Sequence, residues 1–260
     1  MTNLSKQVAR VATVARNRTE KQVIEDLMQM YCNLLTEPAF IEKAFPKTLY
    51  RFGKNFRQEL SYYKHDPKAW DELQKLSQMF LQTVAEAEPF TDHMTSLYDM
   101  EIKGERLGQF LTPPDLAEMI AELQMTSSTL TEAPSRPYTV GDDMGCGAGS
   151  LLLGFIRAVL RKHGKGAVSM LNVRANDLDP EMVKIATVQI VLNSCIHRIP
   201  LHSFHIDNAN ILSEYVAMQE GKHLGYHWLP NTNDRFYQAH HRATGAEAEI
   251  KALDTEKEPA

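Results

Sequence analysis

Apolar positions in the first hundred residues recur at the spacing of an α-helix. Two stripes carry this pattern, one within residues 23–35 and one that starts after Asp66-Pro67 and continues to residue 81. Side chains at i, i+3, i+4 and i+7 lie on one face of a helix, so each stripe predicts a helix with one buried side. We therefore predict an α-helical N-terminal domain over residues 1–104.

The pattern changes in the second part of the chain, where short apolar runs alternate with helical stripes. Such alternation predicts an α/β fold built on a parallel sheet. We assign residues 105–240 to this domain and residues 241–260 to an acidic, disordered tail. The four predicted strands cover residues 138–141, 170–176, 201–206 and 223–229.

A glycine-rich turn, Asp143-Met-Gly-Cys-Gly-Ala-Gly149, follows the first of these strands and precedes a helical segment. Glycines let the backbone turn tightly and approach a ligand, and the helix start offers free N–H groups. A carboxylate at Asp143 would repel a pyrophosphate but suits a cationic amino-acid group, such as the ammonium of S-adenosylmethionine (SAM). The turn therefore predicts a SAM site.

Carboxylates follow the second and third predicted strands, and ligands of open parallel sheets bind beyond the carboxyl ends of strands. Asp177 is our first choice, and Asp179 the second, for accepting hydrogen bonds from ribose hydroxyls. Asp207 is placed to accept one from an adenine amino group. Each has a structural alternative, because Asp179-Pro180 can cap a helix and Asp207 can cap the helix predicted over residues 209–219.

Composition excludes several classes of protein. The chain of 260 residues is 43% hydrophobic and 23% charged, as in ordinary globular proteins. No apolar run approaches the roughly 18 residues that span a bilayer, and residues 1–18 lack the apolar segment of a secretory signal. Three cysteines and the scattered C-terminal histidines fit no disulfide or zinc pattern, so we expect a cytoplasmic protein without a metal site.

A net charge of −5 argues against a uniformly basic nucleic-acid-binding protein, but two segments are locally basic. Residues 6–18 carry four basic side chains, and residues 45–57 combine lysines and arginines with aromatic rings. Phosphates bind lysine and arginine side chains, and exposed bases stack on aromatic rings. The alternative, which we prefer for any single residue, is a solvated helix face with its aromatic side chains packed inward.

A second motif, Gly108-Gln-Phe-Leu-Thr-Pro113, precedes an amphipathic helix and lies 30 residues before Asp143. The two motifs in this order resemble those of N6-adenine DNA methyltransferases, as does Asp92-His-Met-Thr-Ser-Leu-Tyr98 upstream. The pattern is most similar to modification subunits of type I restriction systems and to small phage- or plasmid-borne DNA methylases. The resemblance covers about residues 90–212.

This resemblance implies a Rossmann-like SAM-dependent methyltransferase core behind a helical domain, with DNA as a partner. The residues that it implies for the methionine end of SAM are Gln109, Phe110, Thr112 and Pro113. Those implied for the turn under its amino-acid part are Asp143, Gly145, Gly147 and Gly149. It further implies that Asp177 binds the ribose and Asp207 the adenine.

The catalytic motif of the family is altered in this chain. The family carries Asn or Asp, then Pro-Pro, then Tyr or Phe after the fourth strand, where it holds the adenine amine and stacks on the flipped base. Here the sequence reads Leu229-Pro-Asn-Thr-Asn-Asp-Arg-Phe-Tyr237. We predict a degenerate catalytic pair of Asn231 with Phe236, or with Tyr237 in its place.

Three functions remain open, because the family core has more strands than the four predicted here. The preferred one is a SAM-dependent adenine-N6 DNA methyltransferase of a restriction-modification or mobile element, which relies on a specificity or other partner subunit if it is a trimmed relative. The second is a SAM- or DNA-binding relative that modulates such a complex without methylating DNA. The third is an unrelated SAM enzyme, which the Gly-Gln-Phe-x-Thr-Pro loop disfavours.

Overall fold

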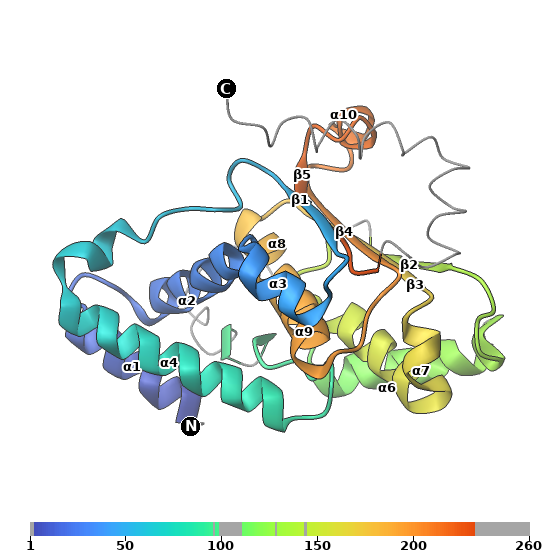
Figure 1. Cartoon of the computed structure of the whole chain (residues 1–260), viewed down its shortest axis with the longest axis horizontal. Helices are drawn as coiled ribbons and strands as arrows, with labels where there is room; N and C mark the ends of the chain where they lie inside the picture. Colours follow the sequence, from blue (N-terminus) through green and yellow to red (C-terminus); the bar gives the residue numbers. More distant parts are fainter. Residues whose placement is uncertain (1–2, 96, 99–110, 128, 143–144, 232–260) are drawn as a thin grey trace.

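The fold is α/β, with one five-stranded sheet in the order β1-β5-β4-β3-β2 (Figure 1). The computed structural model describes residues 3–95, 97–98, 111–127, 129–142 and 145–231. Strands β2, β3 and β4 are parallel, β5 is antiparallel to β4, and β1 is antiparallel to β5. The strands are β1 (Leu49–Phe52), β2 (Tyr138–Asp142), β3 (Leu171–Asp177), β4 (Ser203–Asn208) and β5 (Leu224–Leu229).

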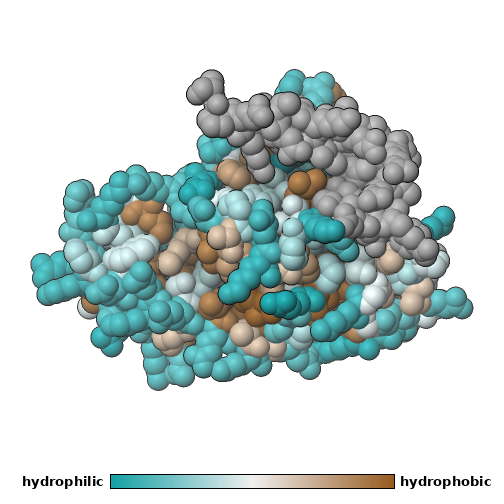
Figure 2. Space-filling view, in the orientation of Figure 1, coloured by the Kyte–Doolittle hydropathy of each residue, from teal (hydrophilic) through white to brown (hydrophobic). Residues whose placement is uncertain are grey.

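Helices precede the sheet and connect its parallel strands. In Figure 1 the N-terminal helices lie to one side of the sheet, and their outer surfaces in Figure 2 are mainly hydrophilic. The N-terminal helices are α1 (Asn3–Val14), α2 (Glu20–Leu35), α3 (Pro38–Ala44) and α4 (Pro67–Glu86). The others are α6 (Pro114–Ser127), α7 (Ser150–Val168), α8 (Pro180–Thr187), α9 (Asn193–His197) and α10 (Tyr215–Gln219), with a π-helical turn η3 at Val188–Leu192 and 3-10 turns at Ser61–His65 and Thr129–Thr131.

Both helices predicted from the N-terminal stripes are confirmed. Thr19 begins α2 with a capping box, in which its hydroxyl accepts from Gln22 N and its own N–H donates to the Gln22 side chain. Asp66 caps α4 by accepting a hydrogen bond from Ala69 N, and Pro67 occupies the first helical position, where its missing N–H costs nothing. The stripes of both helices belong to one hydrophobic core that also contains the sheet.

The range predicted as a helical N-terminal domain also contains a strand, β1, which joins the sheet beside β5. Trp228 Nε1 donates a 2.8 Å hydrogen bond to Thr48 Oγ1, and Tyr226 OH donates a 2.9 Å bond to Leu35 O. The partner of β1 lies about 180 residues away in the sequence, so no local pattern identified it. The domain boundary at residue 104 and the tail from residue 241 lie outside the described residues and stay predictions.

The expectation of a parallel sheet also needs correction at its fourth strand. Residues 224–229 form a strand, as predicted, but β5 runs antiparallel to β4. It pairs on the side of β4 that is remote from β2, and among the described residues β2 and β1 are the two edge strands. The helix predicted over residues 209–219 is present only as α10.

One face of the sheet is polar. Val173, Phe204 and Trp228 are fully buried on the face covered by helices. Arg174 and His205, which are adjacent to Val173 and Phe204 in their strands, point to the opposite face, where Arg174 is exposed and His205 half-buried. Doubly wound sheets are apolar on both faces, whereas such alternation is typical of a sheet with one solvated face.

Trp228 tests the joint core of helices and sheet. Because its ring is fully buried and its N–H is bonded to Thr48, Trp228→Ala is expected to lower the free energy of unfolding by about 3–5 kcal/mol. The matched control is Trp70→Ala, since Trp70 is the other tryptophan and is only half-buried. Urea denaturation followed by circular dichroism measures both; equal losses would contradict a sheet core shared with β1.

Glu25 on α2 makes stability depend on pH. Burial raises the pKa of Glu25 to about 7, and the nearby Glu181 carboxylate adds to the rise. The folded state then holds a proton that the unfolded state has released, so this contribution is full below pH 4.5 and is lost as the pH rises through 7. Glu25→Gln is therefore expected to flatten the fall in unfolding free energy between pH 5 and 8, whereas Glu20→Gln at the exposed start of α2 leaves it unchanged.

Candidate functional site

The buried carboxylate of Asp177 holds the glycine-rich turn at the carboxyl ends of β2 and β3. Its Oδ2 accepts a 2.8 Å hydrogen bond from Gly147 N, and its Oδ1 accepts a 2.9 Å bond from Asp179 N. The residue is only 8% exposed. A carboxylate offers about four lone-pair directions, so Asp177 can accept further hydrogen bonds, for example from two hydroxyl groups.

The turn has a backbone that requires glycine. Gly147 and Gly149 have φ angles of 53° and 87°, in the left-handed region, and Gly149 is the N-cap of α7. A Cβ on Gly149 would lie 3.3 Å from Ala186 Cβ. The turn is closed by a 2.9 Å bond from Gly149 N to Cys146 O and tied to β3 by a 2.9 Å bond from Cys146 N to Asn176 O.

The structure brings the second motif onto the turn. A Cβ added to Gly147 would lie 3.0 Å from Leu111 Cδ2, so Leu111 covers the turn. The reason is the close packing of α6 on α7, where a Cβ on Gly154 would lie 3.0 Å from the Ala117 backbone. The two motifs, 30 residues apart in sequence, therefore form one site, with Thr112 half-buried beside Leu111.

A third segment, residues 90–95, is fixed to the same turn by side chains that the sequence did not single out as functional. Gln189 Nε2 donates to Ala148 O at 2.8 Å, while Gln189 Oε1 accepts from Met94 N at 3.1 Å. Thr95 Oγ1 and Ser150 Oγ lie 2.7 Å apart. The sequence did contain one signal for this contact. Gln189 is a polar residue on the apolar, buried side of its helix, where a polar side chain needs a hydrogen-bond partner.

The two carboxylates after β3 have separate tasks. Asp179 Oδ1 accepts a 2.9 Å bond from Glu181 N at the start of α8, so its structural alternative, a helix cap, is what the structure contains. Asp177 faces the glycine turn instead. Asn208, at the end of β4, donates to Asp177 O at 2.9 Å and so joins the third strand end to this site.

Asp207 is not brought together with Asp177. Paired residues of neighbouring strands share a face, and Asp207 pairs with Asn176, whereas Asp177 pairs with Asn208. The Asp207 carboxylate therefore points to the polar face, where Oδ2 lies 2.8 Å from His205 Nε2. Side chains alternate between the two faces of β4, and the sequence alone does not tell which face Asp207 takes. The alternation places Asp207 on the face away from the predicted adenine site.

Asn231 is also remote from the turn. It follows β5, which ends beside the start of β4 because the two strands are antiparallel. β4 has six residues, a length of roughly 20 Å, and the glycine turn lies beyond its other end. The structure thus does not place Asn231 at the candidate site, while Phe236, Gln109, Phe110 and Asp143 lie outside the described residues.

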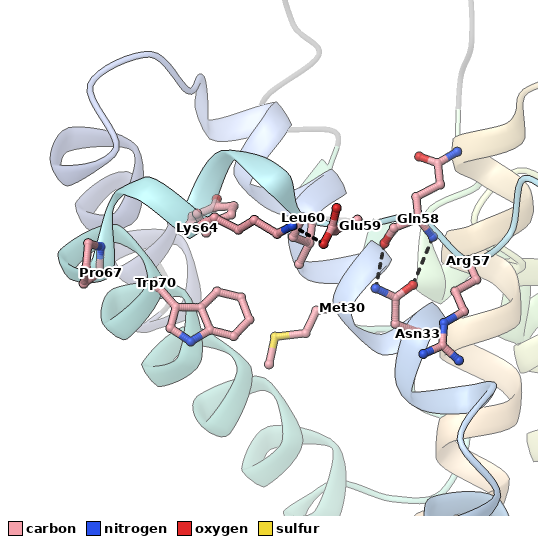
Figure 3. Close-up of a pocket in the computed structure, with 10 residues that line it drawn as sticks. Met30, Asn33, Arg57, Gln58, Glu59, Leu60, Lys64, Pro67 and Trp70 are labelled. Atoms are coloured by element: carbon pink, nitrogen blue, oxygen red, sulfur yellow. Dashed lines mark hydrogen bonds and ion pairs between the residues drawn. The ribbon is translucent and has the colours of Figure 1, made fainter.

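A separate, open pocket of about 900 Å³ lies between α2, α4 and residues 57–64, shown in Figure 3. Met30, Trp70 and Tyr63 give it apolar walls. Its polar residues have protein partners, since Asn33 exchanges hydrogen bonds with the Gln58 backbone and Lys64 pairs with Glu59. None of the glycine-turn residues lines it, so it lacks the chemistry of the predicted site.

The described part of the chain has neither a cluster of metal ligands nor a membrane-spanning helix. No three His, Cys, Asp or Glu side chains in this part of the chain are grouped so that they could hold a metal ion. None of its helices is long and apolar enough to cross a membrane.

The sequence matches the family described as N-6 DNA Methylase over residues 96–226, half of the chain. The chain belongs to the N-6 DNA methylase family. This membership confirms the resemblance drawn from the two motifs. The α/β sheet, with its parallel strands in the order β4-β3-β2, agrees with the predicted Rossmann-like methyltransferase fold.

Two relatives of this N-6 DNA methylase family member come from type I restriction systems. The type I restriction enzyme MpnII methylase subunit of Mycoplasma pneumoniae is 30% identical over 112 residues, which are 42% of this chain and 18% of that protein. A solved methyltransferase subunit from Streptococcus thermophilus is 14% identical with a TM-score of 0.41, covering 81% of this chain and 59% of the other. The matched region thus spans under a fifth of the curated relative.

Gly149 tests the turn of this family member without any ligand. A side chain at Gly149 meets Ala186 and must adopt a left-handed backbone, so Gly149→Ala is expected to lower the free energy of unfolding by about 1–2 kcal/mol. Gly166→Ala is the control, because nothing lies within 4 Å of its added Cβ. Thermal and urea unfolding compare them; a Gly149→Ala protein as stable as the control would refute the described turn.

Proposed function

We propose that this chain binds SAM at the glycine turn and takes part in methylation of adenine N6 in DNA. The observation that carries the proposal is the joining of two family motifs, with Leu111 covering Gly147 while Asp177 holds the Gly147 amide. Family membership supports a methyl donor at such a turn. When bound, SAM supplies an electrophilic methyl group.

The residues of the site suit the parts of SAM differently. We assign Asp177 to the ribose, because an ionised carboxylate with remaining lone pairs accepts hydrogen bonds from adjacent hydroxyls. Gly145, Gly147 and Gly149, together with Asp143, are assigned to the amino-acid part, where the start of α7 also offers backbone N–H groups for a carboxylate. Gln109, Phe110, Thr112 and Pro113 are assigned to the methionine end.

A second candidate function is SAM binding without methyl transfer by this chain alone. The observation that favours it is the position of Asn231 near the start of β4, whereas the glycine turn lies beyond the other end of that strand. In that case another subunit supplies the groups that hold the flipped adenine. The similarity to a methylase subunit of a type I restriction enzyme supports DNA as the substrate and a multi-subunit setting for either candidate.

Asp177→Asn tests the cofactor site in both cases. The amide keeps the shape but loses the charge and one acceptor, so SAM affinity is expected to fall by about tenfold or more. Asp179→Asn is the matched control, since asparagine also caps helices and affinity should stay within about twofold. Isothermal titration calorimetry with SAM and with its demethylated product measures both; unchanged binding in Asp177→Asn would remove the assignment.

Transfer of label from tritiated SAM to unmethylated DNA separates the two candidates. Incorporation by the purified chain supports the enzyme, while SAM binding without incorporation supports the binding relative. Asn231→Ala is expected to leave any transfer unchanged, because Asn231 lies away from the turn. Loss of transfer in a folded Asn231→Ala protein would restore Asn231 as a catalytic residue.

A further inference from the structure

A row of basic side chains crosses the polar face of the sheet. The strand register aligns Arg174 of β3 with His205 of β4, His205 with His227 of β5, and His227 with Arg51 of β1. Residues in register on neighbouring strands point to the same face and lie about 5 Å apart. Four basic residues, far apart in the sequence, are thus placed side by side.

The histidines of this row form a hydrogen-bonded chain. His205 Nδ1 lies 2.8 Å from His227 Nδ1, and His205 Nε2 lies 2.8 Å from Asp207 Oδ2. An ionised carboxylate only accepts, so His205 Nε2 carries a proton and its ring is fixed in orientation. The centre of the row is therefore rigid, which favours it as a binding surface over a set of independently moving side chains.

A cavity of about 500 Å³ lies over this row, a size typical of small-molecule sites. Arg51, Arg174, His205 and Asp207 form its sheet side, and Tyr215 of α10 lines it as well. The Tyr215 side chain is half exposed, so its ring is accessible for stacking.

The cavity contains one arginine and one carboxylate oxygen that other described residues leave unpaired. The carboxylates that line it have basic partners, Asp207 with His205 and Glu220 with Lys222. Arg174 makes no ion pair with any residue that the structure describes. Asp207 is 5% exposed, and its buried Oδ1 has no hydrogen-bond partner among the residues that the structure describes. Buried acceptors are normally satisfied, which indicates a missing donor.

We propose that this cavity binds a phosphorylated nucleoside unit. Arginine forks bind phosphate oxygens, an aromatic ring stacks on a base, and the Asp207 carboxylate accepts from an N–H or O–H of the ligand. The unit is either a free nucleotide or one residue of a nucleic-acid strand, which share this chemistry. The site lies on the face of the sheet opposite Asp177, and its binding does not depend on the methyl transfer proposed above.

Fluorescence anisotropy with a labelled single-stranded deoxyoligonucleotide, competed with AMP, inorganic phosphate and duplex DNA, tests the proposal on the full chain. Arg174→Gln is expected to weaken binding by about tenfold and to reduce the salt dependence of log K by about one. Arg136→Gln is the matched control, because Arg136 is also exposed but lies before β2 and does not line the cavity.

The outcomes identify the source of the ligand. If AMP competes with the oligonucleotide and Arg174→Gln weakens this competition, the ligand is a free nucleotide. If the oligonucleotide binds and AMP does not compete, the ligand is a nucleic-acid strand. Equal affinities in the two arginine variants, or competition by inorganic phosphate as strong as by AMP, would overturn the proposal. Asp177→Asn should retain this binding while losing SAM, so failure here and failure of the proposed function are distinguishable.

Discussion

The hydrogen bond from the Gly147 amide to the buried Asp177 carboxylate is the constraint on which the candidate site depends. It fixes the end of β2 against the end of β3, and the left-handed glycines on either side then direct the chain into α7. Packing of α6 on α7 brings Leu111 over the same turn. The Asp177 carboxylate thus fixes the turn on which Leu111 packs.

The parts of this arrangement that could be predicted from the sequence are those that depend on local order. Gly147 follows one strand, and Asp177 ends the next. This order indicates a ligand-binding turn, because the carboxyl ends of parallel strands lie side by side. The pairing of β1 with β5 joins residues about 180 positions apart, and neither its existence nor its direction leaves a local trace. The face of Asp207 follows from the pleat of β4, and the position of Asn231 follows from the antiparallel pairing of β5 with β4. Neither can be read from the local sequence.

Strand alternation divides the molecule into two chemical environments. On one face, Val173, Phe204 and Trp228 hold the sheet to its helices. On the other, the same strands present Arg174 and His205, which an apolar helix could cover only by burying charge. The sheet has therefore the composition of a surface that meets water or a polar ligand, even though its parallel strands follow the order of a doubly wound fold.

The helical segment that contains the π-helical turn η3 contacts both the glycine turn and the chain that follows α4. Gln189 and Asn193 lie four residues apart on one side of this helical segment, and Asn193 Oδ1 accepts a 2.8 Å bond from Phe90 N, whose residue has a left-handed φ of 63°. From the same helical segment, Gln189 Nε2 donates a hydrogen bond to Ala148 O in the glycine turn. The glycine turn and the chain that leaves α4 are thus joined through η3 by direct hydrogen bonds, so the two halves of the molecule are connected here by polar contacts as well as by their shared core.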